Sequence, residues 1–170
     1  LVSGKYKIIA NIPYNITGAI LKKFLTNENN PEHMVLMVQN EVAKRIVARD
    51  NKESLLSISV KAYGEPSVVT KVPARYFSPP PKVDSAVILI KNISKNLFIN
   101  EKMEEIKFWT LLKTGFAHKR KVLAGNLRDL NQEFDWQKAL IDINLSPKTR
   151  AEDLKLTDWV KLYKNTHNLF

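Results

Sequence analysis

The chain has no cysteine and no long apolar run. Without cysteine, disulfide bonds, thiolate catalysis and the common structural zinc sites are excluded together, and a reducing cytoplasm is the expected compartment. No apolar run approaches the roughly 18 residues that a membrane-spanning helix needs, and no basic and apolar leader precedes Leu1, so we expect a soluble protein. His33, His118 and His167 lack the spacing of metal ligands, and we expect no metal site.

Acidic residues are scarce relative to basic ones. The 170 residues include 27 Lys and Arg against 17 Asp and Glu, which gives a formal net charge of +10 and a pI near 9.7. Such a surplus points to a polyanionic partner, and composition alone leaves RNA, DNA and an anionic membrane open. The surplus is +7 in residues 1–96 and +3 in residues 97–170, so it lies mainly in the first half.

Apolar residues recur in an order that predicts an α/β fold. Continuous apolar runs predict buried strands at residues 6–10 and 33–39, and helical spacing follows each of them, at residues 17–26 and 40–48. This order is typical of a parallel sheet, and the low alternation of the first run predicts a strand covered on both faces. Residues 54–62 fit either helix or strand, and we favour helix.

A stiff connector lies between two further β-rich segments, residues 67–72 and 85–90. The connector, residues 73–84, contains three consecutive prolines, which cannot donate to a sheet ladder and favour an extended, rigid backbone. A rigid segment can hold an aromatic ring in a fixed place. The plainer alternative is that these residues form only a hairpin-like connection.

Helical spacing dominates from about Asn100 onward. Apolar strand character stops near residues 91–100, where Asn and Lys cluster, so we place the domain boundary there. The predicted domains are residues 1–96, an α/β domain, and residues 97–170, a small all-α domain. The sequence shows no internal repeat.

The motif Asn11-Ile12-Pro13-Tyr14 follows the first predicted strand, where ligands bind in open α/β sheets. The exocyclic amine of adenine is a poor nucleophile because its lone pair is delocalised into the ring. An Asn side-chain carbonyl and a nearby backbone carbonyl that accept from this amine would favour its pyramidal, more nucleophilic form. Proline fixes the backbone direction, and tyrosine offers a face for stacking. The alternative is a turn in which Asn only caps the next helix.

Five motifs, in order, resemble those of the rRNA adenine dimethyltransferase family and cover nearly the whole chain. Asn11 to Thr17 is similar to the family's Asn-Leu-Pro-Tyr-Asn-Ile-Ser/Thr, and Gln39 to Arg45 to its Gln-Lys-Glu-Val-x-x-Arg. Phe77 to Val87 is similar to Phe-x-Pro-Pro-Pro-Lys-Val-Asp-Ser-Ala-Val. Phe116 to Lys121 resembles Phe-x-x-Arg-Arg-Lys, and Pro147 to Leu154 resembles Pro-x-x-Arg-Ala-Glu-x-Leu.

This resemblance implies an S-adenosyl-L-methionine-dependent rRNA adenine N6,N6-dimethyltransferase that acts on 16S rRNA of the immature small ribosomal subunit in the cytoplasm. The implied fold is the second half of a Rossmann-like class I methyltransferase sheet followed by a small all-α domain, and the implied state is a monomer. By resemblance, Asn11 and the Ile12 carbonyl hold the adenine amine, with Pro13 between them and Tyr14. Tyr14 stacks on the base, and Phe77 closes over the other face.

Exposed basic residues are the candidates for rRNA binding. Lys119, Arg120 and Lys121, with Arg128, are expected on one side of a helix, where they would bind phosphates. Lys119 replaces an Arg of the family motif, which keeps the charge but loses bidentate geometry. The further candidates are Arg75 and Lys82, which flank Phe77, and Arg150 of the last motif. The alternative is that these groups merely solubilise the surface.

The family's cofactor site has little counterpart in this sequence. The five glycines form no Gly-rich turn of the kind that cradles the methionine end of the donor, and Asn11 is the only expected cofactor contact that remains. We therefore expect that the main cofactor-binding half is absent, that the N-terminal part of a larger domain is missing before Leu1, and that this chain alone is inactive. Two alternatives stay open: a non-catalytic RNA- or DNA-binding protein of the same fold, and a large-subunit rRNA resistance methyltransferase.

Overall fold

A computed structural model describes residues 4–169 and divides the chain into two compact units. The first unit contains residues 1–50 and 59–95, and the second contains residues 51–58 and 96–170. The assignment of residues 51–58 to the second unit is a feature that the sequence pattern did not indicate. The backbone N–H of Glu53 donates to the carbonyl of Glu152 at 2.8 Å, which ties this short segment into its unit.

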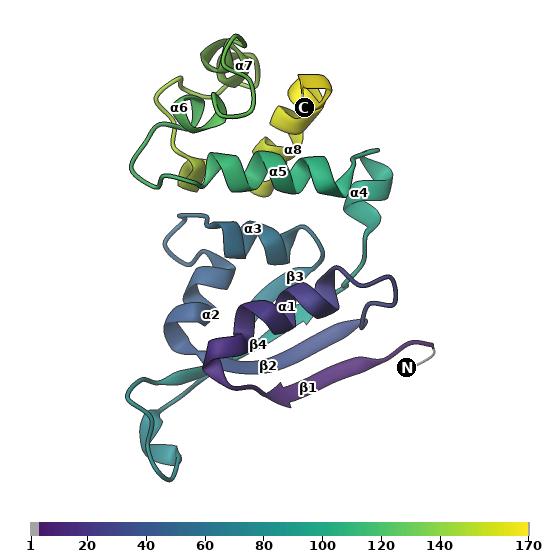
Figure 1. Cartoon of the computed structure of the whole chain (residues 1–170). Helices are drawn as coiled ribbons and strands as arrows, with labels where there is room; N and C mark the ends of the chain where they lie inside the picture. Colours follow the sequence, from purple (N-terminus) through teal and green to yellow (C-terminus); the bar gives the residue numbers. More distant parts are fainter. Residues whose placement is uncertain (1–3, 170) are drawn as a thin grey trace. The chain divides into compact units, whose positions relative to one another are not determined.

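The first unit is an α/β layer arrangement (Figure 1). Its elements in chain order are β1 (Lys7–Asn11), the 3-10 turn η1 (Tyr14–Ile16), α1 (Thr17–Leu25), β2 (His33–Gln39), α2 (Asn40–Val47), α3 (Leu55–Lys61, which begins among the residues of the second unit), β3 (Glu65–Val72), the 3-10 turn η2 (Ala74–Tyr76) and β4 (Ser85–Lys91). The structure confirms the predicted strands and the predicted helices at 17–26, 40–48 and 54–62. Each predicted end differs from the observed one by two residues or fewer.

The four strands of the described residues form one mixed sheet in the order β1-β2-β4-β3. β1 and β2 are parallel, whereas β4 runs antiparallel to both β2 and β3. In the register, Gln39 at the end of β2 pairs with Ser85 at the start of β4, and Val72 at the end of β3 pairs with the same serine. The carboxyl ends of β1 and β2 and the β3–β4 connector therefore meet at one edge of the sheet.

The core of this unit lies on one face of the two central strands. Met34, Leu36 and Val38 of β2 are fully buried, as are the alternate residues of β4 that continue the same layer, Ala86, Ile88 and Ile90. Apolar side chains of the helices are also buried in this unit, among them Leu21 and Leu25 of α1 and Ala43 and Ile46 of α2. Alternate burial is the pattern of a half-covered sheet.

The expectation that the first strand is covered on both faces is wrong. Ile9 is 80% exposed, and Lys7 and Asn11, which share its face, are exposed as well. Within residues 4–169, β1 pairs with β2 on one side only and stands at the edge of the sheet. An apolar run indicates a strand, but it does not reveal which of its faces a neighbouring element covers.

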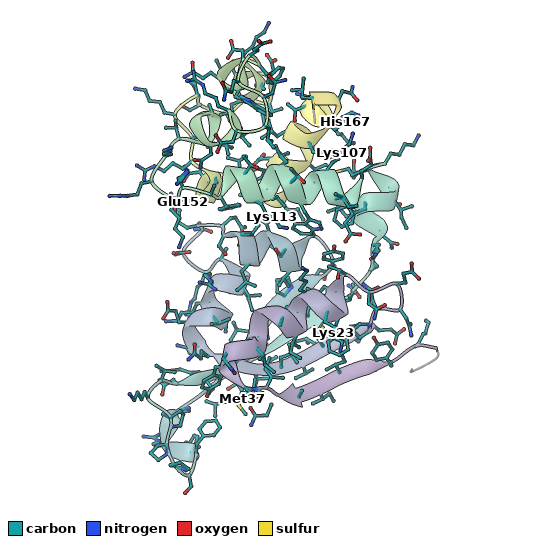
Figure 2. All side chains as sticks on the ribbon, viewed as in Figure 1. Lys23, Met37, Lys107, Lys113, Glu152 and His167 are labelled. Atoms are coloured by element: carbon teal, nitrogen blue, oxygen red, sulfur yellow. The ribbon has the colours of Figure 1, made fainter. Side chains whose placement is uncertain are left out.

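The second unit is helical. Its remaining elements are α4 (Asn96–Asn100), α5 (Glu105–Gly115), α6 (Leu123–Leu127), α7 (Trp136–Asp142), the 3-10 turn η3 (Ala151–Asp153), α8 (Leu156–Thr166) and the 3-10 turn η4 (His167–Leu169). Phe108 and Tyr163 meet edge to face, with ring centroids 6.0 Å apart, and so join α5 to α8. Lys107 donates to the carbonyl of His167 at 3.4 Å beside them (Figure 2).

Large rings fill the core of this helical unit. Trp136 and Trp159 are buried, whereas Trp109 is only half-buried. Ile106 of α5 is 82% exposed, although it lies in the segment where apolar residues recur at helical spacing. Within residues 4–169, every helix is too short or too polar to cross a lipid bilayer.

Candidate functional site

The turn after β1 has a fixed backbone. Asn11 ends the strand and is exposed, and Ile12 anchors the turn because its side chain is buried, with 7% exposure. Pro13 has φ −58° and ψ 134°, and its carbonyl accepts the N–H of Ile16 at 3.2 Å. Thr17, which begins α1, donates its hydroxyl to the carbonyl of Tyr14 at 3.1 Å. The motif therefore presents its amide at the carboxyl edge of the sheet from a rigid loop.

Tyr14 is held by its hydroxyl as well as by its backbone. Its Oη lies 2.6 Å from Oγ of Ser85, which is fully buried at the start of β4. The two residues are 71 positions apart in the chain. The tyrosine ring is half-buried, so this hydrogen bond fixes where its accessible part lies. Sequence reasoning missed Ser85, although a serine at the start of an apolar strand, next to an aspartate, is the signal that could have found it.

Asp84 closes the base of the β3–β4 connector. Its Oδ1 accepts the backbone N–H of Ala74 at 2.9 Å, and its Oδ2 pairs with the ammonium of Lys71 at 2.6 Å. Its carbonyl accepts the N–H of Asn40 at 2.9 Å, which ties the connector to the start of α2. The bond from Lys71, followed by that from Ala74, holds the pKa of Asp84 below its ordinary value. The connector is thus a braced segment, and the prediction of a rigid one fits these bonds.

Phe77 lies on this connector directly after the turn η2. Its N–H donates to the carbonyl of Ala74 at 3.1 Å, and its side chain is half-buried. Arg75 and Lys82, on the same connector, are exposed. Figure 1 shows the connector extending beyond the sheet as an arm, and Figure 2 labels Met37, the register partner of Asn11, at this edge of the sheet. Asn11 and Tyr14 therefore lie at this edge of the sheet, whereas Phe77, Arg75 and Lys82 lie on the arm whose two ends are at the same edge.

The basic residues of the second unit form a separate group. Lys119, Arg120 and Lys121 lie in the turn between α5 and α6, so their expected place on a helix is wrong. The reason is that α5 ends at Gly115 and α6 begins only at Leu123. All three side chains are exposed, which suits contact with a polyanion as well as with solvent.

Buried Asn126 positions the turn that carries these three residues. Its Nδ2 donates to the carbonyls of Gly115, at 2.6 Å, and His118, at 3.1 Å. The same His118 carbonyl accepts the N–H of Lys121 at 3.1 Å. The turn is therefore fixed from inside the unit, and sequence reasoning did not single out this asparagine.

Arg128 and Arg150 complete the predicted basic set in the second unit. Arg128 follows α6 directly and is exposed. Arg150 is also exposed, and its neighbour Thr149 accepts the N–H of Leu123 at 2.8 Å. This bond brings the segment with Arg150 against the first residue of α6.

The described residues offer little to a metal ion. Among residues 4–169, no group of three or more His, Asp or Glu side chains is placed to hold one. Two neighbouring carboxylates, Glu152 and Asp153, pair with a lysine. Lys52 forms an ion pair with Asp153 and lies 3.6 Å from Glu152. The hydrogen bond from Lys52 lowers the pKa of Asp153.

The mixed sheet, in which β4 is antiparallel to both of its neighbours, and the helices beside it form an α/β fold that matches solved rRNA methyltransferases. The solved dimethyladenosine transferase from Plasmodium falciparum matches with a TM-score of 0.79 and 25% identity, covering 96% of this chain and 67% of that one. The solved 23S rRNA methyltransferase ErmE matches with a TM-score of 0.74 and 20% identity, covering 96% and 66%, which supports the fold alone.

The sequence itself narrows the class to one family. A family model described as ribosomal RNA adenine dimethylase matches residues 2–168, and the chain belongs to this family. The ribosomal RNA small subunit methyltransferase A of Dehalococcoides mccartyi strain CBDB1 is 43% identical over an alignment of 162 residues, which covers 92% of this chain and 54% of that protein. Its namesake from Nostoc sp. strain PCC 7120 is 37% identical, with 92% and 59% covered. The chain thus spans somewhat more than half the length of these relatives.

Proposed function

We propose that this chain belongs to an S-adenosyl-L-methionine-dependent rRNA adenine N6,N6-dimethyltransferase of the small ribosomal subunit, and that it supplies the residues that hold the acceptor adenine. The observation that carries the proposal is the turn from Asn11 to Tyr14, which is braced through Ser85 at the sheet edge where the connector with Phe77 also begins and ends. Membership of the ribosomal RNA adenine dimethylase family and the names of its relatives support this assignment.

The proposed roles follow from the chemistry of the adenine amine. The side-chain carbonyl of Asn11 and the backbone carbonyl of Ile12 accept its two N–H groups, which favours the pyramidal form with an available lone pair. Tyr14 stacks on the base that has left its helix, and Phe77 covers the opposite face. Burial of Ile12 and the anchored hydroxyl of Tyr14 support these roles, because both fix the turn before a base arrives.

The described residues do not fit the whole methyl donor. Gly64 and Gly115 serve close packing, since a Cβ would meet the Lys91 carbonyl at 2.8 Å and the Trp159 ring at 2.5 Å, respectively. The other described glycines are Gly4, before β1, and Gly18 and Gly125, within α1 and α6. Within residues 4–169, none of them forms a glycine-rich turn at the sheet edge, so only the acceptor side is assigned here, with Asn11 as the candidate contact to the donor.

We assign the rRNA contacts to two groups of exposed cations. In residues 1–96, proposed as the base-binding domain, these are Arg75 and Lys82. In residues 97–170, proposed as the rRNA-binding domain, the group consists of Lys119, Arg120, Lys121, Arg128 and Arg150. The proposed partner is the rRNA of an immature small subunit, bound by a monomer in the cytoplasm. The small subunit is favoured because the relatives above are named for it, whereas the 23S rRNA enzyme is similar in fold alone.

A chimaera tests the proposal. The part of the D. mccartyi relative that lies outside the matched region is joined to this chain in the relative's own order, and transfer of labelled methyl groups to immature small subunits is measured. We expect the chimaera to methylate adenine and its Asn11→Ala variant to fail, while the 170-residue chain alone transfers nothing. A folded chimaera that binds S-adenosylmethionine and rRNA but transfers no methyl group would contradict the proposal.

A non-catalytic RNA-binding protein of the same fold is the second candidate, and the exposed basic turn of residues 119–121 favours it. The two candidates differ in the same experiment. Saturable, salt-sensitive binding of rRNA by the chain together with an inactive, correctly folded chimaera would support the binding protein. Methyl transfer that depends on Asn11 would exclude it.

A further inference from the structure

Tyr76 has an aromatic ring that is largely exposed to solvent. The side chain is 70% exposed, whereas the next residue, Phe77, is half-buried. Single exposed apolar side chains are ordinary on protein surfaces and by themselves indicate nothing. What distinguishes Tyr76 is its partner, because the guanidinium of Arg75 lies 5.4 Å from the centroid of its ring.

The pair is mounted on a braced turn. The N–H of Tyr76 donates to the carbonyl of Pro73 at 3.1 Å, which closes the 3-10 turn η2. The N–H of Ala74, at the start of this turn, donates to Asp84, which is itself paired with Lys71. Ring and guanidinium are therefore displayed at a fixed place on the arm that Figure 1 shows beyond the sheet edge.

A ring backed by a guanidinium suits one class of ligand. The bases of single-stranded RNA stack on aromatic faces and on arginine planes, with little preference between bases because every base has a π-face. The remaining N–H groups of Arg75 and the exposed ammonium of Lys82 can bind the phosphates on either side of such a base. An apolar partner surface would not account for this excess of positive charge around the ring.

We propose that Tyr76, backed by Arg75, is a stacking subsite for an unpaired nucleotide next to the target adenine. This inference rests on the proposed function, because it takes Phe77 as the cover of the target base. Tyr76 and Phe77 are consecutive residues with Cα atoms about 3.8 Å apart, so two neighbouring nucleotides of one strand are within reach of the two rings. Arg75 then acts on the ring as well as on a phosphate, which extends the role predicted for it.

The test uses the whole 170-residue chain and an oligouridine that contains one adenine with 2-aminopurine beside it, on the 3′ side in one probe and on the 5′ side in another. Stacking quenches 2-aminopurine fluorescence. For one of the two probes we expect quenching on binding, and we expect Tyr76→Ala to relieve it and to lower affinity about five- to tenfold. Tyr76→Phe keeps the ring and is expected to keep both signals.

Val83→Ala is the matched control, because Val83 is 44% exposed on the same connector and has no ring. Its affinity is expected to stay within about twofold of the parent chain, and an RNA duplex is expected to bind the parent chain and Tyr76→Ala equally. Equal effects of Tyr76→Ala and Val83→Ala, or equal losses in Tyr76→Ala and Tyr76→Phe, would overturn the subsite. The assay contains no methyl donor, so a negative result here does not bear on the proposed methyl transfer. Likewise, an inactive chimaera would not change how the fluorescence result is interpreted.

Discussion

At the scale of single residues, the hydrogen bond between Tyr14 and Ser85 joins the turn after β1 to the first residue of β4. Ser85 is fully buried, so removal of the tyrosine hydroxyl leaves the serine without this partner. We expect Tyr14→Phe to lower the free energy of unfolding by about 1–3 kcal/mol, because an unpaired buried polar group costs its desolvation. Urea unfolding of Tyr14→Phe, Ser85→Ala and the double variant measures this.

The double variant is the control in that experiment. It removes both hydroxyls together, so it is expected to be less destabilised than the sum of the single variants by about 0.5–1.5 kcal/mol. Strictly additive losses would mean that the two hydroxyls do not stabilise each other.

Because of Asp84, the stability of the folded chain is expected to depend on pH in the acid range. Its folded pKa lies below the ordinary value of 3.8, first because of the bond from Lys71 and then because of that from Ala74. A carboxylate with a lowered folded pKa contributes stability that is fully present above the unfolded pKa and is lost as the pH falls through the folded one. We therefore expect Asp84→Asn to be less stable than the parent chain at neutral pH.

The difference between Asp84→Asn and the parent chain should shrink steadily as the pH falls below about 3.8, as urea unfolding across a pH series would detect. Lys71→Met serves as the partner control, and its difference in stability from the parent chain should also shrink as the pH falls. A gap that is constant with pH would exclude the carboxylate as its source.

At the scale of elements, the packing of α5 on α8 depends on a glycine. A Cβ at Gly115 would come within 2.5 Å of the ring of Trp159, which is fully buried. We expect Gly115→Ala to cost about 1–3 kcal/mol through overpacking. Gly125→Ala in α6 is the matched control, because its Cβ would meet only a Val122 methyl at 3.6 Å, and helix propensity predicts a gain of up to about 1 kcal/mol. Thermal unfolding that shifts both variants in the same direction would contradict this account.

The turn between α5 and α6 is the element proposed to bind rRNA phosphates. We expect the triple alanine variant of Lys119, Arg120 and Lys121 to bind small-subunit rRNA more weakly. The slope of log affinity against log salt should become shallower by about one to two, because fewer counterions are released. Filter binding across a salt series measures both quantities.

A second triple variant corrects for the lost charge in that experiment. It replaces three exposed lysines of the same unit that lie outside the turn: Lys138, Lys155 and Lys161. A salt slope that changes equally in both triple variants would remove the turn from the rRNA interface.

Local sequence patterns predicted where helices and strands lie better than they predicted which of their faces are buried. β2 begins at His33 and ends at Gln39 as its apolar run predicts, because a continuous apolar run bounded by polar turns is a local signal. The exposed face of β1 could not be predicted, since the apolar run at Ile9 does not reveal where that strand stands in the sheet. Lys119 was placed on a helix because nothing near it in sequence shows that Asn126, seven residues later, holds this segment in a turn.

At the scale of the whole molecule, the sequence named the candidate residues but not their surroundings. Asn11, Tyr14 and Phe77 could be named from the motifs that resemble the family's, but it is the antiparallel course of β4 that brings the ends of the connector with Phe77 to the same sheet edge as Asn11 and Tyr14. The bond between Tyr14 and Ser85 could not be predicted, because it joins positions 71 residues apart that only the folded sheet brings together.

The adenine and the rest of the rRNA are proposed to be held by different residues: those at the sheet edge hold the adenine, while exposed cations of the connector and of the second unit hold the rest of the rRNA. Methyl transfer and rRNA affinity should therefore respond to different substitutions. The most direct measurement compares the chimaera with its Asn11→Ala variant for both quantities on the same immature small subunits. We predict a fall in the transfer rate of about 100-fold or more with rRNA affinity within about twofold. Equal losses of transfer and affinity, or an unchanged rate, would contradict the assignment of Asn11 to the adenine amine.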